Sequence, residues 1–181
     1  MENAESYFAK MRGYTTPPPR PPLAEIFWSW LGAFLGIGLM SIVDHFFLAS
    51  TDLVLVIGSF GASAVLVYGA ITSPLAQPRN LLGGHFISAL IGVAIFTLLP
   101  QTLWLASALA VACAIAAMQI TATLHPPGGA TALIAVIGSD RLHALGFLYA
   151  LVPALSGAII MLVVALLVNN IPKGRRYPLW W

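Results

Sequence analysis

The sequence predicts an all-α membrane protein, a bundle of transmembrane helices of which some are broken or half helices. Three observations predict this class. Of the 181 residues, 59% are hydrophobic and only 8% are charged, whereas soluble domains carry about 25% charged residues. The mean hydropathy is high, at +0.90. The apolar residues also gather into runs that approach the roughly 20 residues a helix needs to cross the hydrocarbon layer.

The chain divides by composition into three parts. Residues 1–23 are charged and Pro-rich and lack the pattern of a cleaved signal peptide, so we expect a retained cytoplasmic tail. Residues 24–168 form a single transmembrane domain. Residues 169–181 are basic and aromatic, and we expect them to lie on the inner surface of the membrane.

Five apolar runs are nearly long enough to span the membrane, and a sixth is short. The five are Phe27–Val43, Leu53–Ile71, Leu81–Leu99, Leu103–Ile120 and Leu145–Val168, and the short one is Ala130–Ile137. Lys and Arg flank the first and last runs and Arg79 lies between the second and third, so the positive-inside rule predicts that both termini are cytoplasmic. Such a topology needs an even number of crossings. Either the short run is a sixth crossing, or another run is re-entrant.

Small residues recur every four positions in several runs, for example at Gly32 and Gly36. The other rows are Gly84, Ser88 and Gly92, and Ala106, Ala110 and Ala114. Such rows let helix backbones approach closely in lipid. We expect them to pack helices within one bundle or between subunits. Together with the small size of the bundle, they favour a homo-oligomer.

A weak internal repeat relates two segments. GASAVL at Gly61–Leu66 resembles GATALI at Gly129–Ile134, and a helix break precedes each segment. The repeat predicts two halves, residues 24–100 and 101–168, with three segments each. An odd number of segments makes the second half inverted relative to the first. Inverted halves with broken helices are typical of transporters whose site lies near the midplane.

The break at His125–Gly129 predicts a binding site. Pro126 and Pro127 end the preceding helix, and Gly128 and Gly129 permit close approach of backbone or ligand. A helix that begins inside the membrane exposes unpaired N–H groups and about half a positive charge, which suits an anion. The predicted binding residues are His125, Pro126, Pro127, Gly128, Gly129, Ala130 and Thr131, with Gly61, Ala62 and Ser63 opposite. The alternative is that these residues only kink and pack a helix.

Three further residues are candidates for an entrance or gate: Arg79, Asn80 and His85. Arg79 would attract anions to the inner mouth, although it also satisfies the positive-inside rule without any such role. We expect His85 at the membrane interface. His125 would gate the site or carry a proton; alternatively, it donates a hydrogen bond to a carbonyl that the prolines leave open.

No pattern of an enzyme, a metal site, a cofactor site or a nucleic-acid-binding surface emerges, because the apolar runs hold no paired carboxylates and the four histidines are scattered. We therefore expect a lipid bilayer and a small anion as partners. Two rival hypotheses remain: a channel for a small neutral solute, and a membrane scaffold or sensor subunit that transports nothing.

Two motifs, LHPPGGATAL and the upstream SPLAQPRNLLGGHFISALIG, resemble those of the HPP family of small integral membrane proteins. The resemblance covers about residues 24–168. It implies a transport function, with nitrite as the leading substrate because some plastid and cyanobacterial members are associated with nitrite movement. It also implies four spans, the number usually given for the family. We expect a bacterial inner membrane as the location.

Overall fold

The computed structural model describes residues 8–13, 15–48 and 55–181, and within these ranges the regular structure is entirely helical. The α-helices are α1 (Leu23–Val43), α2 (Ser59–Ala64), α3 (Pro78–Leu98), α4 (Leu103–Ile120), α5 (Pro126–Ile137), α6 (Asp140–Ala144) and α7 (Ser156–Val168). Shorter helical turns lie at Ala9–Met11, Asp44–Leu48, Val65–Gly69, Pro74–Ala76, Gly146–Ala150 and Leu151–Leu155. The predicted all-α bundle is confirmed.

Four helices in the described part of the chain are long and apolar enough to cross a membrane: Leu23–Leu48, Pro78–Leu98, Leu103–Ile120 and Gly146–Val168. Our expectation of five full spans was therefore wrong. The run Leu53–Ile71 forms only a short helix, Ser59–Gly69, and its first two residues lie outside the described ranges.

The shortened run has a local physical cause. Gly58, Ser59 and Gly61 weaken helix formation, and the N–H of Leu55 donates to Asp44 Oδ1 at 2.6 Å rather than to a helical carbonyl. The chain therefore returns toward the middle of the bundle without forming a helix over the described residues 55–57. The re-entrant alternative describes this run better than a full crossing does.

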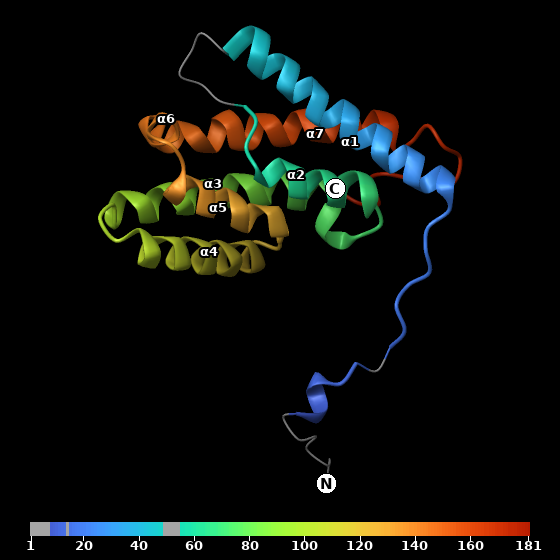
Figure 1. Cartoon of the computed structure of the whole chain (residues 1–181), viewed down its shortest axis with the longest axis horizontal. Helices are drawn as coiled ribbons and strands as arrows, with labels where there is room; N and C mark the ends of the chain where they lie inside the picture. Colours follow the sequence, from blue (N-terminus) through green and yellow to red (C-terminus); the bar gives the residue numbers. More distant parts are fainter. Residues whose placement is uncertain (1–7, 14, 49–54) are drawn as a thin grey trace.

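The helices follow one pattern twice, a long helix, a short helix and a long helix. The first set is α1, α2 and α3, and the second is α4, α5 and the span Gly146–Val168 that ends in α7. In Figure 1, α1 and α3 run from right to left while α2 runs the other way, and all three directions are reversed in the second set. The weak sequence repeat predicts this inverted arrangement.

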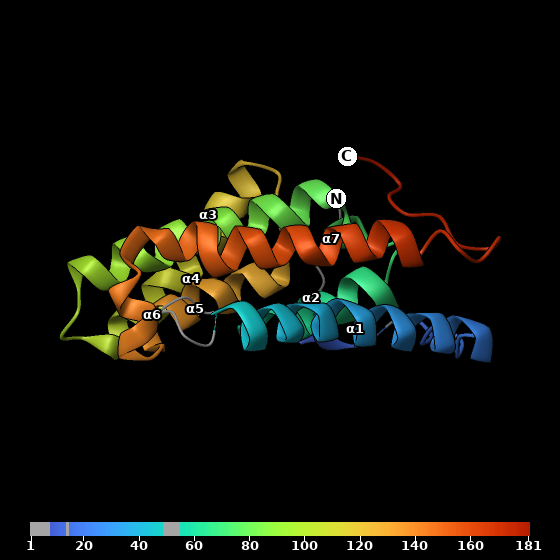
Figure 2. The ribbon, with the colours of Figure 1, turned by 90° about the horizontal axis from the view of Figure 1, so that it is seen from above.

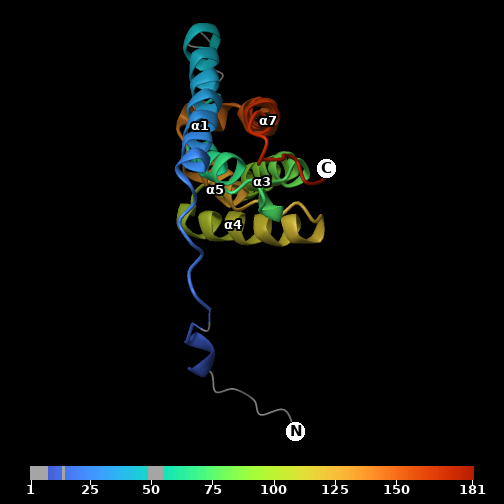
Figure 3. The same ribbon diagram turned by 90° about the vertical axis from the view of Figure 1, so that its right-hand side faces the viewer.

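The long helices pack around the two short ones. Helix α5 lies against both α3 and α4, α1 lies against α7, and α2 contacts α5. The end-on view in Figure 3 shows α4 on the side of the bundle away from α7, and Figure 2 shows α1 and α7 extending side by side. The two short helices thus meet in the interior.

The rows of small residues pack within this chain. A Cβ atom at Gly32 would lie 2.7 Å from Cδ1 of Tyr68, so α1 approaches the segment after α2 only because glycine stands there. Ala106, Ala110 and Ala114 of α4 are completely buried against α5 and α3. Packing within one bundle, the first of the two alternatives, therefore accounts for these rows. The homo-oligomer stays a prediction, and the rows of small residues no longer support it.

The two ends of the chain behave differently. Described residues before α1 extend away from the bundle and are mostly exposed (Figures 1 and 3). The segment after α7 folds back, burying Arg175 and Tyr177. Its expected position on the inner membrane surface stays a prediction; within the molecule it packs against the bundle, while Trp180 and Trp181 stay exposed.

Candidate functional site

The His-Pro-Pro segment breaks the chain between two helices, as the sequence predicts. Helix α4 ends at Ile120, and α5 begins at Pro126 with His125 in an extended conformation as its N-cap. The two prolines have no N–H to donate, and the N–H of Gly128 donates to the His125 carbonyl at 2.8 Å. The polar character of this helix start therefore resides mainly in side chains rather than in the free amides that we expected.

Helices α2 and α5 run in opposite directions and join through their side chains. Near the start of α2, Ser59 Oγ lies 2.9 Å from Thr131 Oγ1. One turn later, Ser63 Oγ lies 2.9 Å from Nε2 of His125. The two segments of the sequence repeat thus place their hydroxyl groups against each other at the centre of the fold.

His85, on α3, completes this contact. Its Nε2 lies 2.7 Å from Ser63 Oγ, and its Nδ1 lies 2.7 Å from Thr131 Oγ1. The side chain is fully buried, so our expectation of an interfacial histidine was wrong. The position follows from helix geometry, since His85 lies two turns into α3, about 10 Å from its first residue.

His125 forms the end of the chain of contacts. Its Nδ1 lies 2.8 Å from the carbonyl oxygen of Leu75, in the turn before α3. Its ring centroid is 5.1 Å from that of His85. We call Ser59, Ser63, His85, His125 and Thr131 the central network. All five side chains are at least 99% buried.

The central network contains two imidazoles and three hydroxyls, but no carboxylate. Helices α2, α3, α4, α5 and α7 contain no Asp or Glu. The hydroxyls and imidazoles are donors as well as acceptors. The arrangement can thus bind a small anion or a small polar solute, and it offers no charged ligand to a cation.

Two glycines allow the helices to reach the network. A Cβ at Gly84 would lie 2.5 Å from His125 Cβ, and a Cβ at Gly128 would lie 2.7 Å from Ser88 Oγ and 2.8 Å from the Gly84 carbonyl. The glycines of both motifs therefore serve the contact between α3 and α5. Ser88 is buried, and its Oγ has no hydrogen-bond partner.

Other predicted site residues lie outside the network. Gly61 and Ala62 are exposed on the outer side of α2. Pro126, Gly129 and Ala130 line an apolar groove of about 490 Å³ between α4 and α5. Pro127 is buried, and its carbonyl lies 3.2 Å from Thr131 Oγ1.

Arg79 and Asn80 hold the loop that leads to His125. The Arg79 guanidinium donates to the Thr121 carbonyl at 3.0 Å, and the Asn80 amide donates to the Leu124 carbonyl at 2.7 Å. Arg79 is exposed at this end of the bundle. The contacts give both residues a structural part, and their part in attracting anions stays a prediction.

Sequence reasoning missed several contributors. The Leu75 carbonyl gave no signal, because any residue has one. Tyr149 donates from its hydroxyl to the Thr131 carbonyl at 3.0 Å, and nothing in its sequence context pointed to that contact. Ser88 had a signal, since it sits in a row of small residues, but we interpreted that row as packing alone.

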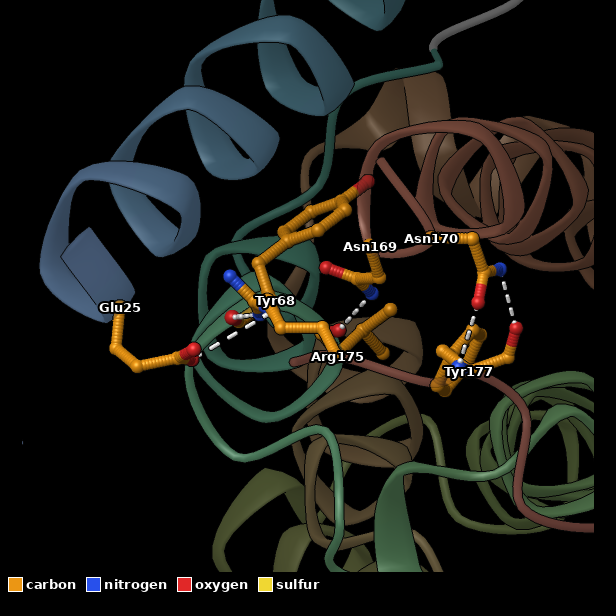
Figure 4. A network of polar contacts seen from close by, with 7 residues as sticks. Glu25, Tyr68, Asn169, Asn170, Arg175 and Tyr177 are labelled. Atoms are coloured by element: carbon orange, nitrogen blue, oxygen red, sulfur yellow. Dashed lines mark hydrogen bonds and ion pairs between the residues drawn. The ribbon is translucent and has the colours of Figure 1, made fainter. Parts of the chain in front are cut away.

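A second polar region lies at the end of the bundle where α7 finishes (Figure 4). The Arg175 guanidinium donates to the Tyr68 carbonyl at 2.6 Å and lies 3.6 Å from the Glu25 carboxylate. The Tyr177 hydroxyl donates to the Ala76 carbonyl at 2.7 Å, and Asn169 Nδ2 donates to the Val67 carbonyl at 2.9 Å. We call these residues, with Asn170, the C-terminal clasp.

Ionisation in the clasp is shifted by burial. Burial lowers the pKa of Arg175, and the nearby Glu25 carboxylate opposes that shift. Burial raises the pKa of the Tyr177 phenol above its ordinary value of about 10.

Some known proteins are similar to this chain in sequence. The sequence profile described as "HPP, transmembrane region" matches residues 18–178. A transmembrane protein of Dictyostelium discoideum is 48% identical over 180 residues, covering 97% of this chain and 63% of that protein. A second from the same organism is 46% identical over 178 residues, covering 97% of this chain and 57% of that protein. The chain thus spans about three fifths of their length, and no solved structure matches it. On the evidence of both motifs, the helix pattern and this match, the chain belongs to the HPP family of transmembrane proteins.

Proposed function

We propose that this protein is a membrane transporter or channel for a small monovalent anion, and that the central network is its binding site. Nitrite is the leading substrate by family resemblance. The observation that carries the proposal is the meeting of two oppositely directed short helices through Ser63, His125 and Thr131, inside a bundle of long apolar helices.

The cost of burying polar groups supports a functional interpretation. Ionisable side chains within membrane spans are rare and usually mark a pathway for ions or protons. Here two histidines are buried together, with ring centroids 5.1 Å apart. Transporters with inverted repeats bind substrate at the junction of discontinuous helices, and α2 and α5 are the discontinuous helices here.

The chemistry of the junction favours an anion over a cation. The hydroxyls can turn their hydrogens toward a bound ligand, and the imidazole N–H groups are further donors. The unpartnered Ser88 hydroxyl lies beside Gly128, next to the network, and adds one more donor. When an anion binds, the network side chains would give up hydrogen bonds to one another and donate them to the anion.

The test is nitrite uptake into proteoliposomes, measured without a pH gradient or membrane potential at neutral pH, with protein-free vesicles reporting the leak of nitrous acid. We expect uptake well above that of protein-free vesicles. Equal uptake in the two preparations overturns the substrate. Protein-dependent uptake of a small neutral solute such as glycerol, without nitrite uptake, favours the rival channel. No uptake of either favours the scaffold.

A pair of variants locates the site. Thr131→Val removes a hydroxyl from the central network and keeps the shape of the side chain. Thr97→Val removes a hydroxyl that bonds only to the Val93 carbonyl one turn back on α3. We expect Thr131→Val to slow uptake by about tenfold to a hundredfold, since a hydrogen bond to an ion contributes roughly 1.5–3 kcal/mol. Equal effects of the two substitutions would contradict the proposal that the central network is the binding site.

We also propose that both termini face the cytoplasm across an inner membrane. The ends where α1 and α3 begin and α7 finishes lie together on one side (Figure 1). The basic segments before α1 and after α7, and Arg79, belong to that side, as the positive-inside rule requires. Labelling of a cysteine introduced at Lys173 with a membrane-impermeant reagent tests this: labelling of intact cells from outside contradicts it.

A further inference from the structure

The central network forms an unbroken sequence of contacts. Its order is Ser59, Thr131, His85, Ser63, His125 and the Leu75 carbonyl, and successive polar atoms lie 2.7–2.9 Å apart. Each imidazole uses both ring nitrogens. Because each contact needs one hydrogen and one lone pair, the positions of the hydrogens can be deduced.

The Leu75 carbonyl, at one end of the network, can only accept a hydrogen bond. Nδ1 of His125 must therefore carry a hydrogen. When His125 is neutral, its Nε2 is an acceptor, so the Ser63 hydroxyl must donate to it. Ser63 then accepts from Nε2 of His85.

The remaining contacts follow in the same way. Nδ1 of a neutral His85 now carries no hydrogen, so it accepts from Thr131. Nδ1 of His85 then takes the single Thr131 hydrogen, so Thr131 does not at the same time donate to its two other acceptors, Ser59 Oγ and the Pro127 carbonyl. With both rings neutral, the hydroxyl hydrogens of Thr131 and Ser63 and the ring hydrogen of His85 all point along the network toward His125.

One added proton reverses this order. If a proton reaches the Thr131 oxygen, the Thr131 hydrogen moves to Nδ1 of His85, the hydrogen of His85 Nε2 moves to Ser63, and the Ser63 hydrogen moves to Nε2 of His125. His125 is then an imidazolium. Nε2 of His125 donates to Ser63, Ser63 to Nε2 of His85, Nδ1 of His85 to Thr131, and Thr131 to Ser59. Every contact of the network is satisfied in this second arrangement, in which Thr131 donates to Ser59, and the two arrangements differ by one proton.

We propose that the central network is a proton relay that takes up one proton and deposits it on His125. Building on the proposed function, we infer that the anion is carried together with this proton, as a pair without net charge.

The absence of carboxylates supports the pairing with an anion. The titratable groups facing His125 and His85 are each other, from α3 and the start of α5, and the Tyr149 phenol through the Thr131 carbonyl. Helices α2, α4 and α5 contribute no acidic side chain there, and the turn before α3 contributes a carbonyl. Arg79, the cation of α3, is at the exposed end and bonded to Thr121. A buried cation needs a counter-ion, and a bound monovalent anion supplies one.

The test is nitrogen-15 NMR of the full chain in lipid bilayers, with labelled histidine, across a pH titration. His85→Gln and His125→Gln assign the two signals, and His143 serves as an internal reference outside the network. At high pH we expect the hydrogen of His125 on Nδ1 and that of His85 on Nε2. On acidification, His85 should switch its hydrogen to Nδ1 over the same pH interval in which His125 becomes charged. A His85 that keeps its tautomer while His125 gains charge overturns the relay.

A matched pair of variants tests the link between the rings. Ser63→Ala removes the atom that joins them, so the switch of His85 should no longer follow the charge on His125. Ser156→Ala removes a serine hydroxyl of α7 that bonds only within its own helix end, and it should leave both signals as in the natural chain. Unchanged coupling in Ser63→Ala overturns the relay. If Ser63→Ala does not fold, the titration of the natural chain decides alone.

Nitrite addition separates the relay from the transport function. Because binding of the anion and the proton is reciprocal, saturating nitrite should raise the midpoint of His125 ionisation by about one pH unit, which is a tenfold stronger binding of nitrite to the protonated network. No shift overturns the pairing with nitrite. A coupled switch of both rings without any nitrite uptake would overturn the proposed function and leave the relay in place.

Discussion

The molecule buries polar groups in two regions that are built differently. The central network joins side chain to side chain, through Ser63 and Thr131 on either side of His85. The C-terminal clasp joins side chains mostly to backbone carbonyls, such as those of Tyr68 and Ala76 (Figure 4). One region is without acidic groups and lies among the long helices, while the other contains an ion pair at the end of the bundle.

The difference separates two uses of buried polarity. A backbone carbonyl can only accept, so a contact to it has one arrangement and fixes the chain in place. Contacts between hydroxyls and imidazoles have two arrangements, since each group can donate or accept. The clasp therefore has the chemistry of a structural anchor. The central network has the chemistry that the proposed binding site and proton relay require.

The largest expected effect comes from a methyl group at Gly128. Gly128→Ala places a Cβ within 3 Å of Ser88 Oγ, the Gly84 carbonyl and Met118 Sδ, and overpacking costs about 3 kcal/mol. We expect a large fall in the thermal midpoint. In the NMR titration, the tautomer of His85 should no longer follow the charge on His125.

The neighbouring glycine is the matched control. The nearest atom to a Cβ at Gly129 is Val111 Cγ1, at an ordinary 3.8 Å. Gly129→Ala should keep the thermal midpoint near that of the natural chain. Equal losses in the two variants would show that the two glycines act through backbone freedom and not through the contact of α5 with α3.

Breaking the clasp should affect stability and spare the site. Arg175→Met removes the charged donor to the Tyr68 carbonyl and keeps most of the apolar stem, so we expect a loss of about 2 kcal/mol. Thermal unfolding in detergent measures the loss. The histidine titration should be unchanged, and a changed titration would contradict the separation of the two regions.

A smaller effect is expected at Tyr177, and it depends on pH. Tyr177→Phe removes the donor to Ala76 and should cost about 1 kcal/mol at neutral pH. Because burial raises the pKa of Tyr177 in the folded state, the unfolded chain loses this proton first. The stability that Tyr177 contributes is present below pH 10 or so and declines as pH rises further. The difference in thermal midpoint between the two proteins should shrink over that alkaline range.

The smallest effect is expected at Glu25. Its side chain is 41% exposed and lies 3.6 Å from the Arg175 guanidinium, and exposed ion pairs contribute about 0.5 kcal/mol. Glu25→Gln should therefore barely move the thermal midpoint. A loss as large as that of Arg175→Met would mean that the ion pair, not the bond to Tyr68, anchors the clasp.

The outline of the fold could be predicted from local signals. Long apolar runs gave the long helices, and the break at Pro126 and Pro127 gave the start of α5, because proline cannot continue a helix. The prediction of a full span at Leu53–Ile71 was wrong. Hydropathy counts apolar residues but does not register that Leu55 bonds to Asp44 instead of to a helical carbonyl.

The candidate site was predicted only in part. His125, Ser63 and Thr131 stood beside visible breaks and proved to be in contact. Gly61 and Ala62 stood beside the same break but lie on the outer side of α2, because which side of a short helix faces inward depends on its neighbours.

The sequence by itself determined that this chain is a bundle of membrane helices with two interrupted segments, because hydrophobicity and proline chemistry act over a few adjacent residues. The tertiary structure decided which polar groups meet. His85 lies 40 residues from His125, and only the crossing of α3 with α2 and α5, made close by Gly84 and Gly128, places a single serine oxygen between the two rings.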